Sequence, residues 1–160
     1  MYKCFPKDSP MISKLKITGR QHTFFETIPQ LENVEKLVGR IAGNRLYSPL
    51  TVLLKLGQYD QQKSKSAACN KGFINYWKHL LGPSMKFGLF FNEDIGTIFI
   101  AGPYSSLFLQ EVDGKKLGAL SQGIYGVLRG LGLSDQKTSE AIQKLGEGQY
   151  LLLGKVSRDD

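Results

Sequence analysis

The sequence predicts a single α+β domain, a ferredoxin-like sandwich in which helices cover one face of a mainly antiparallel sheet, with an inserted central segment. Two observations predict this class. Short runs rich in β-branched and aromatic residues alternate with longer runs of helical apolar spacing, in the order strand-helix-strand, then strand-helix-helix-strand. The 160 residues, 41% of them hydrophobic, suffice for one core, and no apolar run is long enough to cross a membrane.

The domain is expected over residues 21–157, after a flexible basic leader at 1–20. "HTFFETI" at 22–28 has the composition of a strand. Pro29 suits the start of the following helix. Its apolar face is spaced at helical intervals and comprises Leu31, Val34, Leu37, Val38 and Ile41. "SPLTVLLKL" at 48–56 then predicts a buried strand.

The central segment, 57–92, is expected to be a variable insertion. Residues 57–72 are polar without periodicity and predict a loop. "FINYWKHLL" at 73–81 predicts a short helix that ends at Gly82-Pro83, and "MKFGLFF" fits either a helix or a strand.

The carboxyl-terminal half predicts a strand at 95–103 and then a long helix over 117–131. Ser134 is a good N-cap for the next helix, which we expect to end before Gly146 as its C′ residue. "GQYLLLGKV" at 148–156 predicts the last strand.

The expected helix at 117–131 contains four glycines, and each interior glycine costs about 1 kcal/mol relative to alanine. Small residues recur one turn apart in Ala119-x-x-x-Gly123 and Gly126-x-x-x-Gly130. Such spacing lets another backbone approach closely. We therefore predict that Ala119, Gly123, Gly126 and Gly130 receive a neighbouring helix or a second subunit. An anion site on the turn "RGLGLSD" is the alternative interpretation of these glycines.

The chain carries a net charge of +7, and residues 55–86 hold six lysines against one aspartate. "KGF" at 71–73 matches the start of an RNA-recognition strand, whose aromatics stack on bases. The alternative function is therefore nucleic-acid binding through Lys63, Lys65, Lys71, Phe73, Tyr76, Trp77, Lys78 and Lys86. The competing interpretation is a solvated basic face above a helix that buries Phe73 and Trp77.

No pattern in the sequence indicates catalysis. His22 and His79 are isolated, Cys4 and Cys69 lack metal-ligand spacing, and no nucleophile elbow occurs. We expect no enzyme activity, no cofactor and no metal. Two cysteines and the absence of an apolar amino-terminal segment favour a cytoplasmic protein.

A further pattern consists of "IGTIFIAGP" at 95–103, "LGAL" at 117–120 and "VLRGLGLSDQKTSEAIQKLGEGQYLLLGKV" at 127–156. In this order the motifs resemble a bacterial general stress protein domain family, also catalogued as a heat-induced stress protein domain. "FFETIPQLENVEKLVGRI" is similar to the first strand and helix of that family. Residues 57–92 depart from it, because they are polar and basic where the family is often apolar. This departure speaks against transferring any membrane association from the family to this chain.

The resemblance implies a stress-associated protein of unresolved biochemistry, with no catalytic residues to transfer. The function expected from the sequence is that of a non-catalytic cytoplasmic domain. It would act through an unknown protein partner or as a homo-oligomer.

Overall fold

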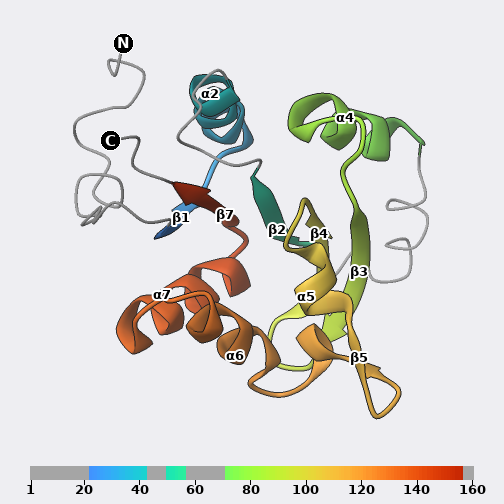
Figure 1. Ribbon diagram of the computed structural model, residues 1–160, viewed down its shortest axis with the longest axis vertical. Helices are drawn as coiled ribbons and strands as arrows, with labels where there is room; N and C mark the ends of the chain where they lie inside the picture. The colour runs from blue at the N-terminus through green and yellow to red at the C-terminus, as the bar shows by residue number, and fades with distance from the viewer. Residues whose placement is uncertain (1–21, 43–49, 57–70, 157–160) are drawn as a thin grey trace.

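The computed structural model describes residues 22–42, 50–56 and 71–156, which form one five-stranded sheet and its covering helices (Figure 1). The amino-terminal part contains β1 (His22–Ile28), α2 (Leu31–Ala42), β2 (Thr51–Lys55) and α4 (Lys71–Leu81). The remainder contains β3 (Phe87–Asn92), β4 (Gly96–Ala101), α5 (Ser105–Leu109), β5 (Glu111–Val112), β6 (Lys115–Lys116), η3 (Leu117–Ala119), α6 (Gly123–Gly130), α7 (Asp135–Gly146) and β7 (Tyr150–Val156). None of the described helices is long and apolar enough to cross a membrane.

The sheet has the order β1-β7-β2-β4-β3, and all its neighbouring strands run antiparallel. The predicted α+β class with an antiparallel sheet is therefore confirmed. The finer ferredoxin-like outline stays a prediction. Helices α4 and α5, the β5–β6 hairpin, a fifth strand in the sheet and a second helix in the α6–α7 pair are additions to the simple strand-helix-strand-strand-helix-strand order of that fold.

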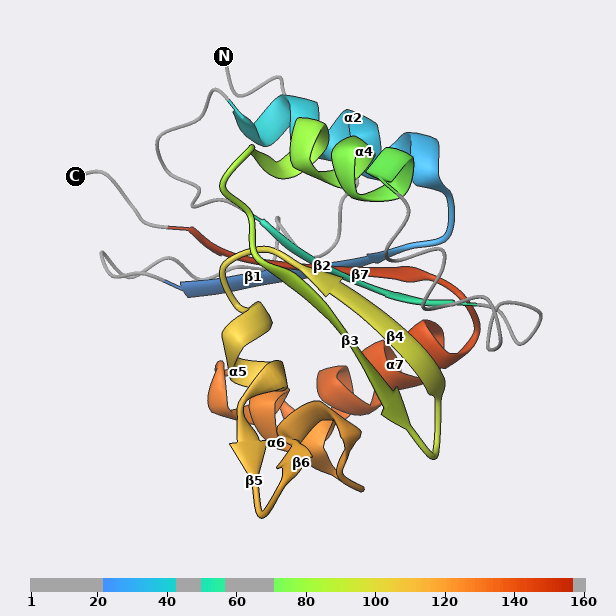
Figure 2. The same cartoon turned by 90° about the vertical axis from the view of Figure 1, so that its right-hand side faces the viewer.

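Helices cover both faces of the sheet, so the prediction of helices on one face is wrong. Figure 2 shows α2 and α4 above the sheet and α5, α6 and α7 below it. The central strands explain the two layers, because successive side chains of a strand point to opposite faces. Leu152 of β7 packs in the core under α2 and α4, whereas Leu151 and Leu153 pack in the core with α6 and α7. All three side chains are fully buried, so each face needs a cover.

The part of the central segment that the structure describes packs into the domain, and its status as a variable insertion stays a prediction. Helix α4 buries Ile74 and Trp77 in the core that it shares with α2. Strand β3 pairs with β4 from Phe87 opposite Ala101 to Asn92 opposite Gly96. The ambiguous "MKFGLFF" stretch is thus largely an edge strand, stabilised by its hairpin with β4. Residues 57–70 lie outside the described ranges.

The expected helix at 117–131 is interrupted, which corrects that prediction. Only the 3₁₀ turn η3 and the eight-residue α6 form, and Gln122 between them adopts a left-handed conformation with φ of 65°. The chain turns back tightly here. A Cβ on Gly123 would lie 1.8 Å from the carbonyl oxygen of Leu117. Tertiary contacts of this loop therefore override the helical apolar spacing of the sequence.

Helix α7 begins as predicted and ends slightly later. The Ser134 side chain accepts a hydrogen bond from the backbone N–H of Lys137 at 3.2 Å, which confirms the N-cap. Gly146 is the last helical residue rather than C′. The left-handed residue after the helix is Gly148, with φ of 97°.

Candidate functional site

Helix α6 separates two hollows on the lower side of the domain, and the Gln122 residue before the helix lines both. The first, which we name the apolar groove, lies between α5, η3 and α6. Its volume is about 350 Å³, and it is lined by Leu107, Gln110, Leu117, Gln122, Gly123, Gly126, Val127, Gly130 and Leu131. None of these lining residues carries a charge.

The structure divides the four predicted small residues into two pairs. Gly123 is buried, and Ala119 is half-buried against the lower core. These two serve packing within the chain. Gly126 and Gly130 are exposed in the apolar groove, and a Cβ on either would have no atom within 4 Å among the described residues. The predicted close approach of another backbone is therefore not made at these two glycines by the described part of the chain.

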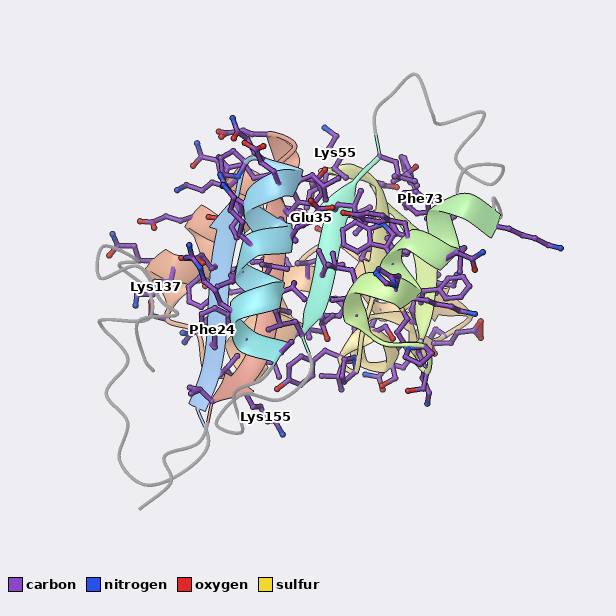
Figure 3. The ribbon with its side chains drawn as sticks, turned by 90° about the horizontal axis from the view of Figure 1, so that it is seen from above. Phe24, Glu35, Lys55, Phe73, Lys137 and Lys155 are labelled. Atoms are coloured by element: carbon purple, nitrogen blue, oxygen red, sulfur yellow. The ribbon has the colours of Figure 1, made fainter. Side chains whose placement is uncertain are left out.

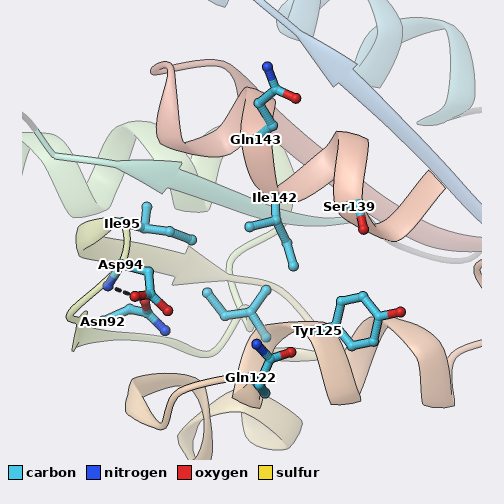
Figure 4. A pocket seen from close by; sticks show the side chains of 9 residues that line it. Asn92, Asp94, Ile95, Gln122, Tyr125, Ser139, Ile142 and Gln143 are labelled. Atoms are coloured by element: carbon cyan, nitrogen blue, oxygen red, sulfur yellow. Dashed lines mark hydrogen bonds between the residues drawn. The ribbon is translucent and has the colours of Figure 1, made fainter. Parts of the chain in front are cut away.

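The second hollow, which we name the polar pocket, lies between the β3–β4 turn, α6 and α7. Its volume is also about 350 Å³, and it is lined by Asn92, Asp94, Ile95, Gln122, Ile124, Tyr125, Ser139, Ile142 and Gln143. Figure 4 shows Asn92 and Asp94 on one side, Tyr125 and Ser139 on the other, and Ile142 pointing into the space between them. Both its volume and its mixture of apolar and polar groups are typical of a small-molecule site.

Asn92 fixes one wall of the polar pocket. Its side chain is 3% exposed. Nδ2 donates to the carbonyl oxygens of Gly118 at 3.0 Å and Leu120 at 3.4 Å. Oδ1 accepts from the backbone N–H of Asp94 at 2.9 Å. The Asn92 carboxamide therefore holds the turn and the loop before α6 together.

The electrostatic character of the polar pocket comes from Asp94, the only ionisable carboxylate among its lining residues. No lysine, arginine or histidine lines the pocket. Gln143 donates to Glu147 at 3.2 Å and keeps its carbonyl oxygen as an acceptor. The pocket thus presents amides, hydroxyls and one carboxylate over an apolar base.

The basic aromatic segment does not form the predicted stacking platform. It is a helix rather than a strand, and Trp77 is only 2% exposed. The ring of Phe73 packs edge-on against that of Phe99, with ring centroids 4.8 Å apart. Trp77 is therefore closed to bases, and the half-buried ring of Phe73 packs against the core. Of the two residues that a helix was expected to bury, Trp77 is buried and Phe73 is half-buried.

Tyr76 faces α2 and donates its hydroxyl hydrogen bond to the Glu35 carboxylate. Figure 3 shows Glu35 on the side of α2 toward α4. Burial raises the pKa of Tyr76, and the hydrogen bond and the negative charge of Glu35 raise it further. Lys71 and Lys86 are exposed and Lys78 is half-buried, whereas Lys63 and Lys65 lie outside the described residues. Among the described residues, a nucleic-acid site would rest on these three lysines.

Two buried hydroxyls at the start of α5 have no hydrogen-bond partner among the described residues, namely those of Tyr104 and Ser105. Burial raises the pKa of Tyr104. Neither side chain lines either hollow. Within the described ranges, no three His, Cys, Asp or Glu side chains are grouped to hold a metal ion. Cys4 and Cys69 lie outside those ranges.

The sequence did not predict the polar pocket. Its lining comes from the β3–β4 turn, the loop before α6, α6 itself and α7, so no contiguous motif marks it.

The sequence does contain a local hairpin signal close to the apolar groove. "DG" at 113–114 is a hairpin signal, and it forms the β5–β6 turn with positive φ at both residues. That hairpin is rooted beside the apolar groove through Gln110 and Leu117.

Comparisons of the chain with protein-family models, curated proteins and solved structures give no match. The resemblance to a stress protein domain family therefore stays a prediction drawn from the motifs at 95–156.

Proposed function

We propose that this domain acts by associating with protein, in the first place with a second copy of itself, through the apolar groove beside α6. The observation that carries the proposal is the open face of Gly126 and Gly130 within that groove. The two glycines are one helical turn apart, so together they leave a strip of bare backbone. A partner helix could approach that strip closely.

The two exposed glycines lower the stability of α6. Each exposed helical glycine costs about 1 kcal/mol relative to alanine, and nothing among the described residues of the chain uses the space that they leave. Around them, Leu107, Val127 and Leu131 offer apolar side chains at the groove. Covering these side chains would stabilise a complex by about 25 cal/mol for each Å² of apolar surface removed from water.

Charge around the groove favours a second copy as the occupant. The chain as a whole is strongly basic, with a net charge of +7, which opposes pairing of most of its surface with itself. The groove lining is uncharged, and the adjoining β5–β6 hairpin is balanced. Its exposed charged residues are Glu111, Asp113, Lys115 and Lys116. A two-fold axis brings the same patch against itself, so a patch with both signs can pair.

The proposal assigns the domain no catalytic step. Its association with stress and its cytoplasmic place rest on the resemblance and the composition described above. Both are part of the proposal, and neither is needed for the test of the groove.

The test is the sedimentation behaviour of the full chain over a wide concentration range, compared between the wild type and Gly126→Leu. A Cβ at 126 meets no atom of the described residues within 4 Å, so the variant should fold with unchanged or higher thermal stability. It should also fill the groove and abolish association. Gly39→Leu is the matched control, because Gly39 is an exposed helical glycine of α2, and within the described ranges no atom lies within 4 Å of its Cβ position.

We expect Gly39→Leu to associate like the wild type. Two results would contradict the proposal. One is a wild-type chain that remains monomeric at every concentration. The other is a folded Gly126→Leu variant that associates as strongly as the wild type.

A further inference from the structure

We propose that the polar pocket binds a neutral, polyhydroxylated ring of the size of a single sugar unit. This site is distinct from the groove of the proposed function, since it lies on the other side of α6 and is formed with α7 and the β3–β4 turn. The two hollows share only Gln122.

The polar groups of the pocket match the hydrogen-bonding character of hydroxyl groups. A sugar hydroxyl both donates and accepts, so a site for it needs both kinds of partner. Gln122 and Gln143 provide carboxamides, Tyr125 and Ser139 provide hydroxyls, and Asp94 provides a carboxylate that only accepts. Figure 4 shows Asp94, Gln122 and Ser139 around the hollow, from three different elements, whereas the carboxamide of Gln143 and the hydroxyl of Tyr125 point away from its centre.

The apolar part of the pocket suits the C–H face of a sugar ring. Ile95, Ile124 and Ile142 line the hollow, and the ring of Tyr125 borders it. Ile95 and Ile124 are buried members of the lower core, so this surface is rigidly supported. A concave, mainly apolar lining with a few polar groups is the usual composition of a small-ligand site.

The charge of the lining selects against ionic ligands. Asp94 contributes a negative charge and no cation balances it within the pocket, so a phosphate or carboxylate would be repelled. A cation would pair only with the exposed carboxylate of Asp94, and an exposed ion pair contributes little binding free energy in water. A neutral ligand with many hydroxyl groups uses the whole lining.

The pocket is also held in shape before any ligand arrives. Asn92 is fully committed to the turn and loop, and it thereby positions the backbone of Asp94. Gln122 has a left-handed backbone, which is uncommon for a residue other than glycine. It is placed so that its side chain lines the pocket. A site whose geometry is fixed in advance loses less entropy on binding.

The experiment is a titration of the isotope-labelled full chain by NMR with glucose, galactose, mannose and N-acetylglucosamine, each to about 50 mM, a range that detects binding as weak as about −4 kcal/mol, or a dissociation constant of about 1 mM. We expect at least one of these sugars to shift the amide signals of Asp94, Gln122 and Ser139 in a saturable way. The phosphate ester of glucose should bind more weakly than glucose.

Three variants locate the response. Ser139→Phe should fill the pocket and abolish the shifts, whereas Glu140→Phe, on the neighbouring exposed position of α7, should retain them. Asp94→Ala should weaken binding by about tenfold through loss of a charge-assisted hydrogen bond. Gly126→Leu should leave sugar binding unchanged, so the outcome is separable from that of the association test.

The proposal is overturned if none of the four sugars produces a saturable shift. It is also overturned if the phosphate ester binds more tightly than glucose, or if the shifts persist in Ser139→Phe while that variant remains folded.

Discussion

The side-chain nitrogen of Asn92, at the end of β3, lies 3.0 Å from the carbonyl oxygen of Gly118 in η3 and donates a hydrogen bond to it. The contact joins an edge strand of the sheet to the loop that leads into α6. A neighbouring close contact supports it, because a Cβ on Gly118 would lie 2.8 Å from the ring of Phe90. Asn92 therefore determines where α6, and with it each of the two hollows, sits against the sheet.

Replacing Asn92 by leucine should destabilise the domain by about 3 kcal/mol, because a buried carbonyl and the N–H of Asp94 would lose their partners. Equilibrium unfolding in urea measures the change. Asn75→Leu, at an exposed position of α4, is the control and should change stability by less than about 0.5 kcal/mol. Equal effects of the two substitutions would show that the Asn92 contacts are not important.

Gly102 in the "AGP" motif should tolerate no side chain. Its φ is 125°, and a Cβ would lie 2.5 Å from the carbonyl oxygen of Leu50 and from Cα of Thr51. Gly102→Ala therefore combines backbone strain with a collision and should cost about 4 kcal/mol. Gly82→Ala separates strain from collision, since Gly82 has a φ of 119° and a Cβ there would have none of the residues that the structure describes within 4 Å.

Thermal unfolding of both variants gives the comparison. We expect Gly82→Ala to lower the free energy of unfolding by about 1 kcal/mol, through backbone strain alone. A Gly102→Ala variant as stable as Gly82→Ala would mean that the chain relieves the collision at Leu50 and Thr51.

The two ends of α6 should respond oppositely to alanine. Gly123→Ala places a Cβ 1.8 Å from the Leu117 carbonyl oxygen and should destabilise the fold by at least about 2 kcal/mol. Gly130→Ala meets no atom of the described part of the chain within 4 Å and should stabilise the monomer by about 0.5–1 kcal/mol. Denaturant midpoints, measured at a low protein concentration where association is negligible, give the direction of the stability change for each variant. Destabilisation by both substitutions would contradict the open position of Gly130.

Stability should decrease at alkaline pH through Tyr76. Burial, the hydrogen bond to Glu35 and the charge of Glu35 raise its pKa above the ordinary value of 10.0. A pKa that is higher in the folded state means that the folded chain holds the proton more tightly than the unfolded chain. This contribution to stability is therefore complete below about pH 10 and decreases as the pH rises further.

Burial also raises the pKa of Tyr104 and Tyr150, which adds to the same trend. Urea unfolding at a series of alkaline pH values should show a smaller decrease for Tyr76→Phe and for Glu35→Gln than for the wild type. Glu32→Gln, an exposed change in the first turn of α2, should follow the wild type. If the stability of Tyr76→Phe decreased with pH as steeply as that of the wild type, the decrease would come from the other tyrosines.

Local patterns in the sequence were sufficient to place most helices and strands. Helical apolar spacing gave α2 and α7, and the Ser134 cap is where the pattern predicted it. Runs such as "TVLLK" and "TIFIA" gave β2 and β4, because short apolar β-branched runs fit buried strands. The same periodicity failed at 117–131, where the contacts of Gly123 and Asn92 break one expected helix in two.

The sequence by itself determined the α+β class and the content of the core, since these follow from the spacing and size of apolar side chains along the chain. Tertiary structure alone decided which strands are neighbours, and it placed helices on both faces of the sheet. It also exposed Gly126 and Gly130 while it buried Gly123 and Trp77. The polar pocket belongs to the same category, because its lining joins residues from Asn92 to Gln143 that only folding brings together. Periodicity reports on which side of its own element a residue lies, whereas a site depends on how separate elements meet.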